Sequence, residues 1–152
     1  MEENPTRKEF DDLKYIVENH KHRQYDQTKD LGLDSTRYIV WRVLDSGSFQ
    51  SVASFGGDFE VPFDGTITAV YAYADTAGTT GSATIDIHLN GTTIMSATKI
   101  SIETTEKSSR NATTQPVLTT TAVVTGNILT VDIDAIQTTP AKGLTVVLVI
   151  TT

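Results

Sequence analysis

A short stretch in which apolar and polar residues strictly alternate constrains the fold of this chain more than any other feature. Ile85, Ile87 and Leu89 alternate with polar residues, and the pair Asn90-Gly91 follows at once. A period of two places the apolar side chains on one face of a β-strand. Asn-Gly favours a two-residue hairpin turn because both residues tolerate a positive φ. The stretch therefore predicts two antiparallel strands joined by a tight turn.

Similar strand and turn signals recur through the second part of the chain. Strands are expected near Phe59, over residues 66–74, on both sides of a turn at Gly126, and over residues 144–150. Threonine supplies about one residue in six, and its branched Cβ suits the half-exposed surface of a strand. Short strands at this spacing are typical of antiparallel sandwiches. We therefore expect an all-β fold, with an antiparallel β-sandwich or jelly-roll-like domain over residues 46–152.

Residues 1–45 follow a different pattern, that of a short N-terminal helix and an extended linker. A strand is also expected near the end of this segment, over residues 38–44. Asn4 and Pro5 supply an N-cap and a proline at the first helical position. A narrow seam at spacings of three and four follows, and such a stripe does not stabilise an isolated helix. Its partner is either the β domain or copies of the same helix, and we expect this segment to attach and trimerise the protein. The seam residues are Phe10, Leu13, Val17 and His20.

Two of the three histidines, His20 and His22, lie one residue apart where the helical pattern ends. On a continuing helix they would point about 200° apart, whereas in an extended segment they project to the same side. A metal site needs more ligands than two, so a three-fold axis would have to supply the rest. The alternatives are a metal ion at a His20/His22 collar, a hydrogen-bonded histidine collar, or a polar linker. No other cofactor is expected.

The last expected strand breaks the alternation. Leu144, Val146 and Leu148 form one apolar face, but Val147 and Val149 make the opposite face apolar too. A strand with two apolar faces is covered on both sides. The cover is either a loop of the same chain or another subunit.

Composition excludes several classes of partner. The net charge of −7 argues against nucleic acid and against an anionic membrane surface. Without cysteine there are no disulfides, thiolate nucleophiles or cysteine zinc sites. No apolar run approaches the roughly 18 residues of a membrane span, and the polar N-terminus is not that of a secretory signal. We expect a protein made in the cytoplasm.

The pattern does not predict an enzyme. Asp86, His88 and Thr84 share one face of a strand, as parts of a catalytic triad could. However, residues two apart on any solvent-facing strand look the same, and no nucleophile elbow is present. Asp132 and Asp134 also fit an exposed face better than a pair of catalytic carboxylates. We expect a polar outer face and no catalysis.

Several motifs resemble those of tailed-bacteriophage virion proteins. A helix followed by His20-x-His22 and a Tyr-Asp pair is similar to junctions in phage fibre and spike proteins. The part of the chain from about residue 59 to residue 150 resembles small β domains of phage virion proteins. The matching stretches are "VPFDGTITAVYAYAD", "IDIHLNGTTIM", "GNILTVDIDAI" and "GLTVVLVITT".

The resemblance implies a non-enzymatic, homotrimeric structural protein located in the virion, either a capsid-decorating (cement) protein or a head fibre. Its partners would be other copies of itself and the major capsid protein or another virion protein. The alternative is a tail fibre or adaptor, or a receptor-binding protein that recognises carbohydrate. Tyr71 and Tyr73 share a strand face and would form a stacking platform for such a ligand, or pack within the protein.

Overall fold

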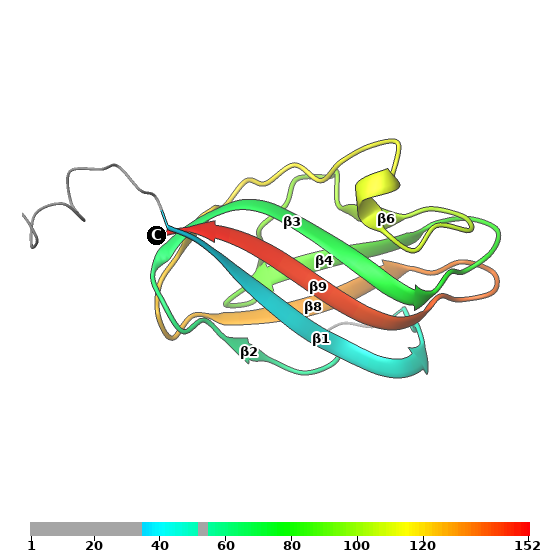
Figure 1. Ribbon diagram of the computed structural model, residues 1–152, viewed down its shortest axis with the longest axis horizontal. Coiled ribbons are helices and arrows are strands. Elements are labelled where there is room, and N and C mark those ends of the chain that lie inside the picture. The colour runs from blue at the N-terminus through cyan, green and yellow to red at the C-terminus, as the bar shows by residue number, and fades with distance from the viewer. Residues whose placement is uncertain (1–34, 52–54) are drawn as a thin grey trace, which may run out of the picture. The chain divides into compact units, whose positions relative to one another are not determined.

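The computed structural model describes residues 35–51 and 55–152, which form two antiparallel β-sheets (Figure 1). The first sheet has the strand order β1-β9-β3-β7, and the second has the order β2-β8-β4-β5, with β6 paired to β4. A 3₁₀ turn, η1, is the one helical element of the described residues. The elements are β1 (Thr36–Ser48), β2 (Phe59–Glu60), β3 (Gly65–Thr76), β4 (Ala83–Leu89), β5 (Thr92–Thr93), β6 (Ile100–Ile102), η1 (Ser109–Asn111), β7 (Ala122–Val123), β8 (Ile128–Ala135) and β9 (Lys142–Thr151).

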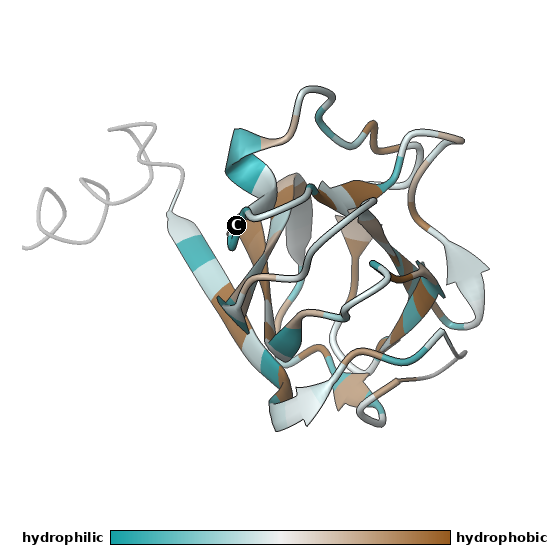
Figure 2. Cartoon of the chain, turned by 90° about the vertical axis from the view of Figure 1, so that its right-hand side faces the viewer, coloured by the Kyte–Doolittle hydropathy of each residue, from teal (hydrophilic) through white to brown (hydrophobic). Residues whose placement is uncertain are grey.

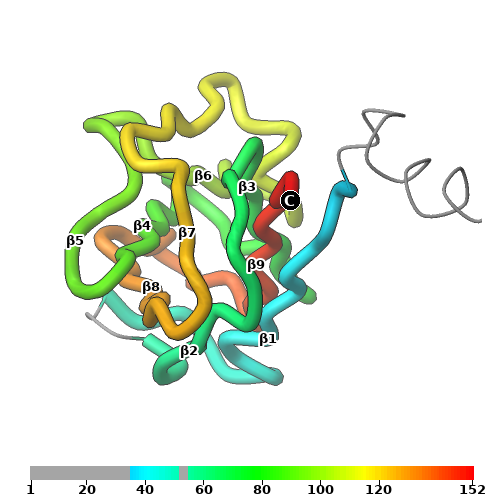
Figure 3. Tube along the Cα trace, turned by 90° about the vertical axis from the view of Figure 1, so that its left-hand side faces the viewer, coloured from blue at the N-terminus to red at the C-terminus, as the bar shows by residue number. Residues whose placement is uncertain are grey.

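The path of the chain between the sheets is that of a jelly roll. The chain alternates between sheets from β1 to β4, and again from β7 to β9. Figure 3 shows the two layers, with β1, β9 and β3 in one and β4 and β8 in the other. Two facing sheets connected in this way are the mark of a jelly roll. The predicted all-β antiparallel sandwich is confirmed, while the expected N-terminal helix and the linker up to residue 34 lie outside the described residues.

Alternation along the strands separates a buried inner side from an outer side. Ile85 and Ile87 on β4 are fully buried, as is Leu148 on β9. Trp41 of β1 packs against Phe59 of β2 with ring centroids 5.6 Å apart, so it belongs to the core between the sheets. Figure 2 shows the apolar segments, in brown, recurring along the strands of both sheets.

The hairpin predicted from Asn90-Gly91 is confirmed. His88 pairs with Thr93 and Leu89 with Thr92, which leaves two residues in the loop. Asn90 has a φ of 50° and Gly91 a φ of 82°, as a primed turn requires. Local chemistry alone therefore determines this element.

The β domain begins earlier than the expected boundary between residues 45 and 46. β1 starts at Thr36 and pairs with β9 from that residue onward. Ile39, Trp41 and Val43 of this strand are buried in the core. The expected boundary rested on the distribution of positive charge, since eight of the 12 lysine and arginine residues precede Asp45. Charge reports on the surface, whereas backbone pairing and burial decide which residues belong to a sheet.

The polar segment between β6 and β7 lies along part of β3. The Ala74 N–H donates to the Lys107 carbonyl at 2.7 Å, and the Ala72 N–H donates to the Ser109 hydroxyl at 2.9 Å. Ser109 is fully buried. This segment covers one end of the β3 edge and brings Arg110 to the outer side of the first sheet.

Candidate functional site

The outer side of the first sheet carries exposed apolar side chains. Because Ile39 and Trp41 point into the core, alternation sends Tyr38 and Val40 outward. Tyr38 is 60% exposed and Val40 is 66% exposed. We define the outer face as the side chains of the first sheet that point away from the core: Tyr38, Val40, Arg42, Ala69, Tyr71, Tyr73, Thr145, Val147 and Val149.

Strand register brings most of these residues into two apolar rows that cross β1, β9 and β3. The rows are Tyr38–Val149–Ala69 and Val40–Val147–Tyr71. Val147 is only 7% exposed because it stands on a central strand, between Val40 and Tyr71. Tyr38 and Val40, at the β1 ends of the two rows, remain exposed, so no loop of the described residues covers them.

The sequence predicted part of this surface. It identified Val147 and Val149 as the second apolar face of the last strand, and the structure places both on the outer face. Tyr38 and Val40 were not predicted, although alternation around Trp41 indicates that they point outward. Their place beside Val147 and Val149 depends on the pairing of β1 with β9, which no local pattern reveals.

The outer face has a polar end formed by Arg42 and Asp75. Arg42 Nη1 donates to Asp75 Oδ1 at 2.9 Å and to Thr145 Oγ1 at 3.0 Å, and Arg42 Nη2 also bonds to Asp75. The hydrogen bond from Arg42 lowers the pKa of Asp75 below its ordinary 3.8, and the same bond raises the pKa of Arg42. Both side chains are partly exposed, so this ion pair borders the apolar rows with fixed charge.

Tyr71 and Tyr73 point outward from β3 but have different surroundings. The guanidinium carbon of Arg110 lies 3.7 Å from the centroid of the Tyr71 ring, an arrangement typical of a cation–π contact. Tyr73 is 42% exposed. Of the pair predicted as a stacking platform, Tyr73 therefore offers an open ring, whereas Tyr71 is half-buried beneath Arg110.

A charged cluster lies on the outer side of the second sheet. Asp86 is 1% exposed, and its Oδ2 lies 2.6 Å from Lys99 Nζ. Thr93 Oγ1 donates to Asp86 Oδ1 at 2.7 Å, and Lys99 also reaches Asp134 at 2.8 Å. Hydrogen bonds to Asp134 and then to Asp86 raise the pKa of Lys99. The predicted solvent-exposed position is therefore wrong for Asp86, because Lys99 and Thr93 lie over the strand and enclose its carboxylate.

His88 in this cluster lies between two carboxylates. Its Nε2 is 3.3 Å from Asp86 Oδ2 and its Nδ1 is 3.2 Å from Asp132 Oδ2. In a catalytic triad, the histidine lies between the nucleophile and the acid. Here the nearby hydroxyl of Thr93 donates to Asp86 instead, so His88 has no nitrogen directed at a nucleophile. The arrangement is that of an ion-pair network.

The remaining predicted site residues lie outside the described part of the chain. These are Phe10, Leu13, Val17, His20 and His22. Within residues 35–51 and 55–152, no group of three or more histidine, aspartate or glutamate side chains converges as a metal site would require. No helix in the same ranges is long and apolar enough to cross a membrane.

Comparisons with known proteins give distant structural similarity alone. No protein-family model matches the chain, and no curated protein matches it. Among solved structures, the chain is similar to the native structure of a family 35 carbohydrate-binding module from Clostridium thermocellum. The two share 15% sequence identity with a TM-score of 0.39, over 74% of this chain and 97% of that module.

Proposed function

We propose that this chain is a non-enzymatic structural protein of a tailed-phage virion, a homotrimer that decorates the capsid as a cement protein or forms a head fibre. The observation that carries the proposal is the pair of apolar rows on the outer face, whose ends at Tyr38 and Val40 are exposed. A contiguous exposed apolar patch bordered by polar groups is typical of an interaction surface. The Arg42–Asp75 pair supplies such a border.

The energetics favour repeated copies as the partner. Burying a large apolar side chain stabilises an interface by roughly 1.5–3 kcal/mol, so one row alone forms a weak contact. Closed symmetry repeats the contact in every copy, and binding to a particle at several points raises the effective concentration of each further contact. The acidic, threonine-rich composition favours solubility at high density.

Two further observations support a structural role in a virion. His88 and the Thr93 hydroxyl are both directed at carboxylates, which favours an ion-pair network over a catalytic site. The sequence motifs of the β domain resemble phage virion proteins, and double-sheet jelly rolls occur in viral capsid proteins.

A matched pair of substitutions tests the assembly. V40K adds a charge to the exposed end of an apolar row, and V124K adds the same charge at a valine that is 54% exposed in the turn between β7 and β8. Because burying an unpaired charge is costly, we expect V40K to lose the trimer. Sedimentation equilibrium should give three times the 16.5 kDa chain mass for the wild type and V124K, and one chain mass for V40K.

A wild-type protein that sediments as one chain at micromolar concentration contradicts the proposal. So does a V40K variant that retains the wild-type mass, because the outer face would then not form the interface.

The alternative is a tail fibre or adaptor, or a receptor-binding protein that recognises carbohydrate. Tyr73 favours it, since an exposed aromatic ring on a sheet stacks against sugar rings. A glycan array probed with the wild type and Y73A separates the two proposals, because a glycan signal that depends on Tyr73 would support the alternative.

A further inference from the structure

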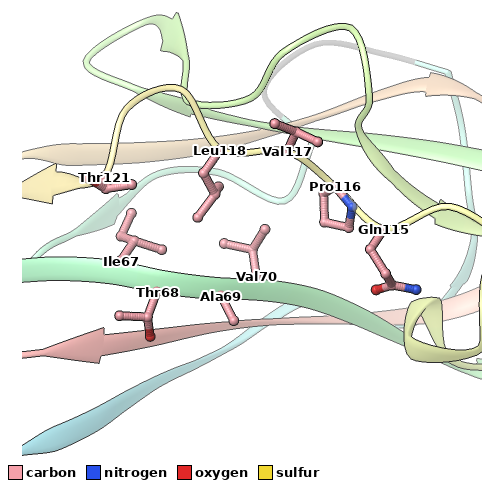
Figure 4. A pocket seen from close by; sticks show the side chains of 9 residues that line it. All are labelled: Ile67, Thr68, Ala69, Val70, Gln115, Pro116, Val117, Leu118 and Thr121. Carbon is pink, nitrogen blue, oxygen red and sulfur yellow. The ribbon is translucent and has the colours of Figure 1, made fainter.

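A groove runs along β3, opposite the segment 115–118 (Figure 4). Its volume is about 470 Å³. In Figure 4, Ile67 and Val70 point from β3 toward Leu118, which points back at them. None of the residues that line the groove is charged. The groove is therefore an open, largely apolar slot between β3 and the segment that faces it.

The β3 edge that borders this groove has no partner strand among the described residues. Pairing with β7 covers only the start of β3, and it ends where the Ile67 N–H donates to the Thr121 carbonyl at 2.7 Å. The next contact is at Ala72, whose N–H donates to the Ser109 hydroxyl. Val70 lies between them, and strand alternation directs its N–H and carbonyl to the same edge as those of Ala72. These groups face the groove.

On the opposite wall, the backbone groups of Val117 are already paired. The Val117 N–H donates to the Thr98 carbonyl at 3.1 Å, and the Val117 carbonyl accepts from the Ser96 N–H at 2.8 Å. Pro116 has no N–H to offer. A ligand in the groove therefore finds backbone hydrogen-bond partners on β3 and an apolar contact from the half-buried Leu118.

We propose that this groove binds an uncharged, extended peptide segment of a partner protein, which adds to β3 in line with β7. An extended chain presents N–H and carbonyl groups at the spacing of the strand that it joins, so it pairs with those of Val70. At about 3.3 Å per residue, the gap between Ile67 and Ala72 accommodates roughly three to five residues. Every second side chain then faces Leu118, which favours apolar residues at those positions.

The probe is the blocked peptide acetyl-Val-Thr-Val-Thr-Val-amide, titrated into the full chain and followed by amide NMR. We expect saturable binding with the largest shifts at Val70 and its neighbours on β3. L118K places an ammonium group in the apolar slot and should weaken binding by about tenfold. L44K makes the same substitution at another half-buried leucine, on the opposite edge of the first sheet, and should leave binding unchanged.

Backbone methylation of the peptide keeps the test independent of how well L118K folds. Alternate residues of a strand direct their N–H groups to opposite sides. Methylating the backbone nitrogens of the threonines removes the N–H groups on one side of the peptide, and methylating those of the valines removes the N–H groups on the other. We therefore expect one of the two peptides to lose binding and the other to retain it. Equal affinity of the two peptides, shifts that map to the outer face, or no saturation at millimolar peptide would overturn the proposal.

The groove and the outer face are tested separately. V40K should lose the trimer and keep peptide binding, whereas L118K should keep the trimer and lose peptide binding. Failure of one proposal thus leaves the other standing.

Discussion

At the scale of single residues, Asp86 shows how a tertiary contact changes the role of a side chain. Its position two residues before His88 on a strand looks like that of any solvent-facing carboxylate. In the fold it is 1% exposed, and Lys99 and Thr93 bond to its two oxygens. A buried charge is tolerated only when it is paired and hydrogen-bonded, so this carboxylate and its partners stabilise the second sheet together.

Removing the buried carboxylate should therefore destabilise the protein. We expect D86A to lower the free energy of unfolding by about 2 kcal/mol, because Lys99 loses a charged partner and Thr93 its acceptor. D134A removes the other carboxylate bound to Lys99, one that is 41% exposed, and should cost less than about 1 kcal/mol. Urea unfolding followed by circular dichroism measures the free energy of unfolding of both variants. Equal losses in D86A and D134A would show that burial of a carboxylate does not determine how much it stabilises the protein.

At the scale of elements, β9 explains the unusual pattern of the last strand. Its two apolar faces follow from its place between β1 and β3, where one side meets the core and the other forms the middle of the outer face.

The strand β1 is instead an edge of its sheet, and a short segment packs against it. Phe55 N–H donates to the Val131 carbonyl at 2.6 Å, and Gly56 follows with a φ of 79° against Val43.

Alanine substitutions at two adjacent glycines distinguish the cost of backbone strain from the cost of this close contact with β1. G57A places a Cβ at a φ of 83° in open space, which should cost about 1 kcal/mol. G56A puts its Cβ against the Val43 carbonyl oxygen, well inside van der Waals contact, and a backbone atom cannot rotate away. We expect it to cost at least about 2 kcal/mol more, as measured by denaturant unfolding. Similar free energies of unfolding for G56A and G57A would mean that the segment can move away from β1 without destabilising the protein.

At the scale of the whole molecule, the jelly roll presents two different surfaces from one strand. β3 contributes Ala69, Tyr71 and Tyr73 to the outer face, while its edge near Val70 borders the groove. The proposed trimer contact and the proposed strand addition therefore occupy neighbouring parts of the fold and use different chemistry. One depends on burial of apolar side chains, and the other on backbone hydrogen bonds.

The N-terminal seam is predicted to contribute to the same assembly. L13D together with V17D charges the apolar stripe, and we expect the protein to sediment as one chain, since buried like charges oppose association. K8D together with N19D adds acidic residues on the opposite side of the expected helix and should leave the trimer intact. A trimer that survives L13D/V17D would assign assembly to the outer face alone.

The amino-acid sequence by itself determined the features that depend on near neighbours. The alternation of Ile85, Ile87 and Leu89 sets which side of β4 faces the core, and Asn90-Gly91 sets the turn that follows, because both act over a few residues. The all-β class follows from the repetition of such signals along the chain.

Only the tertiary structure decided which strands became neighbours. Tyr38 and Val40 meet Val147 and Val149 because β1 pairs with β9, and Asp86 meets Lys99 because the chain returns over β4. Such pairings join residues far apart in the chain, and their register depends on the packing of the whole core, which a period of two along one strand does not encode.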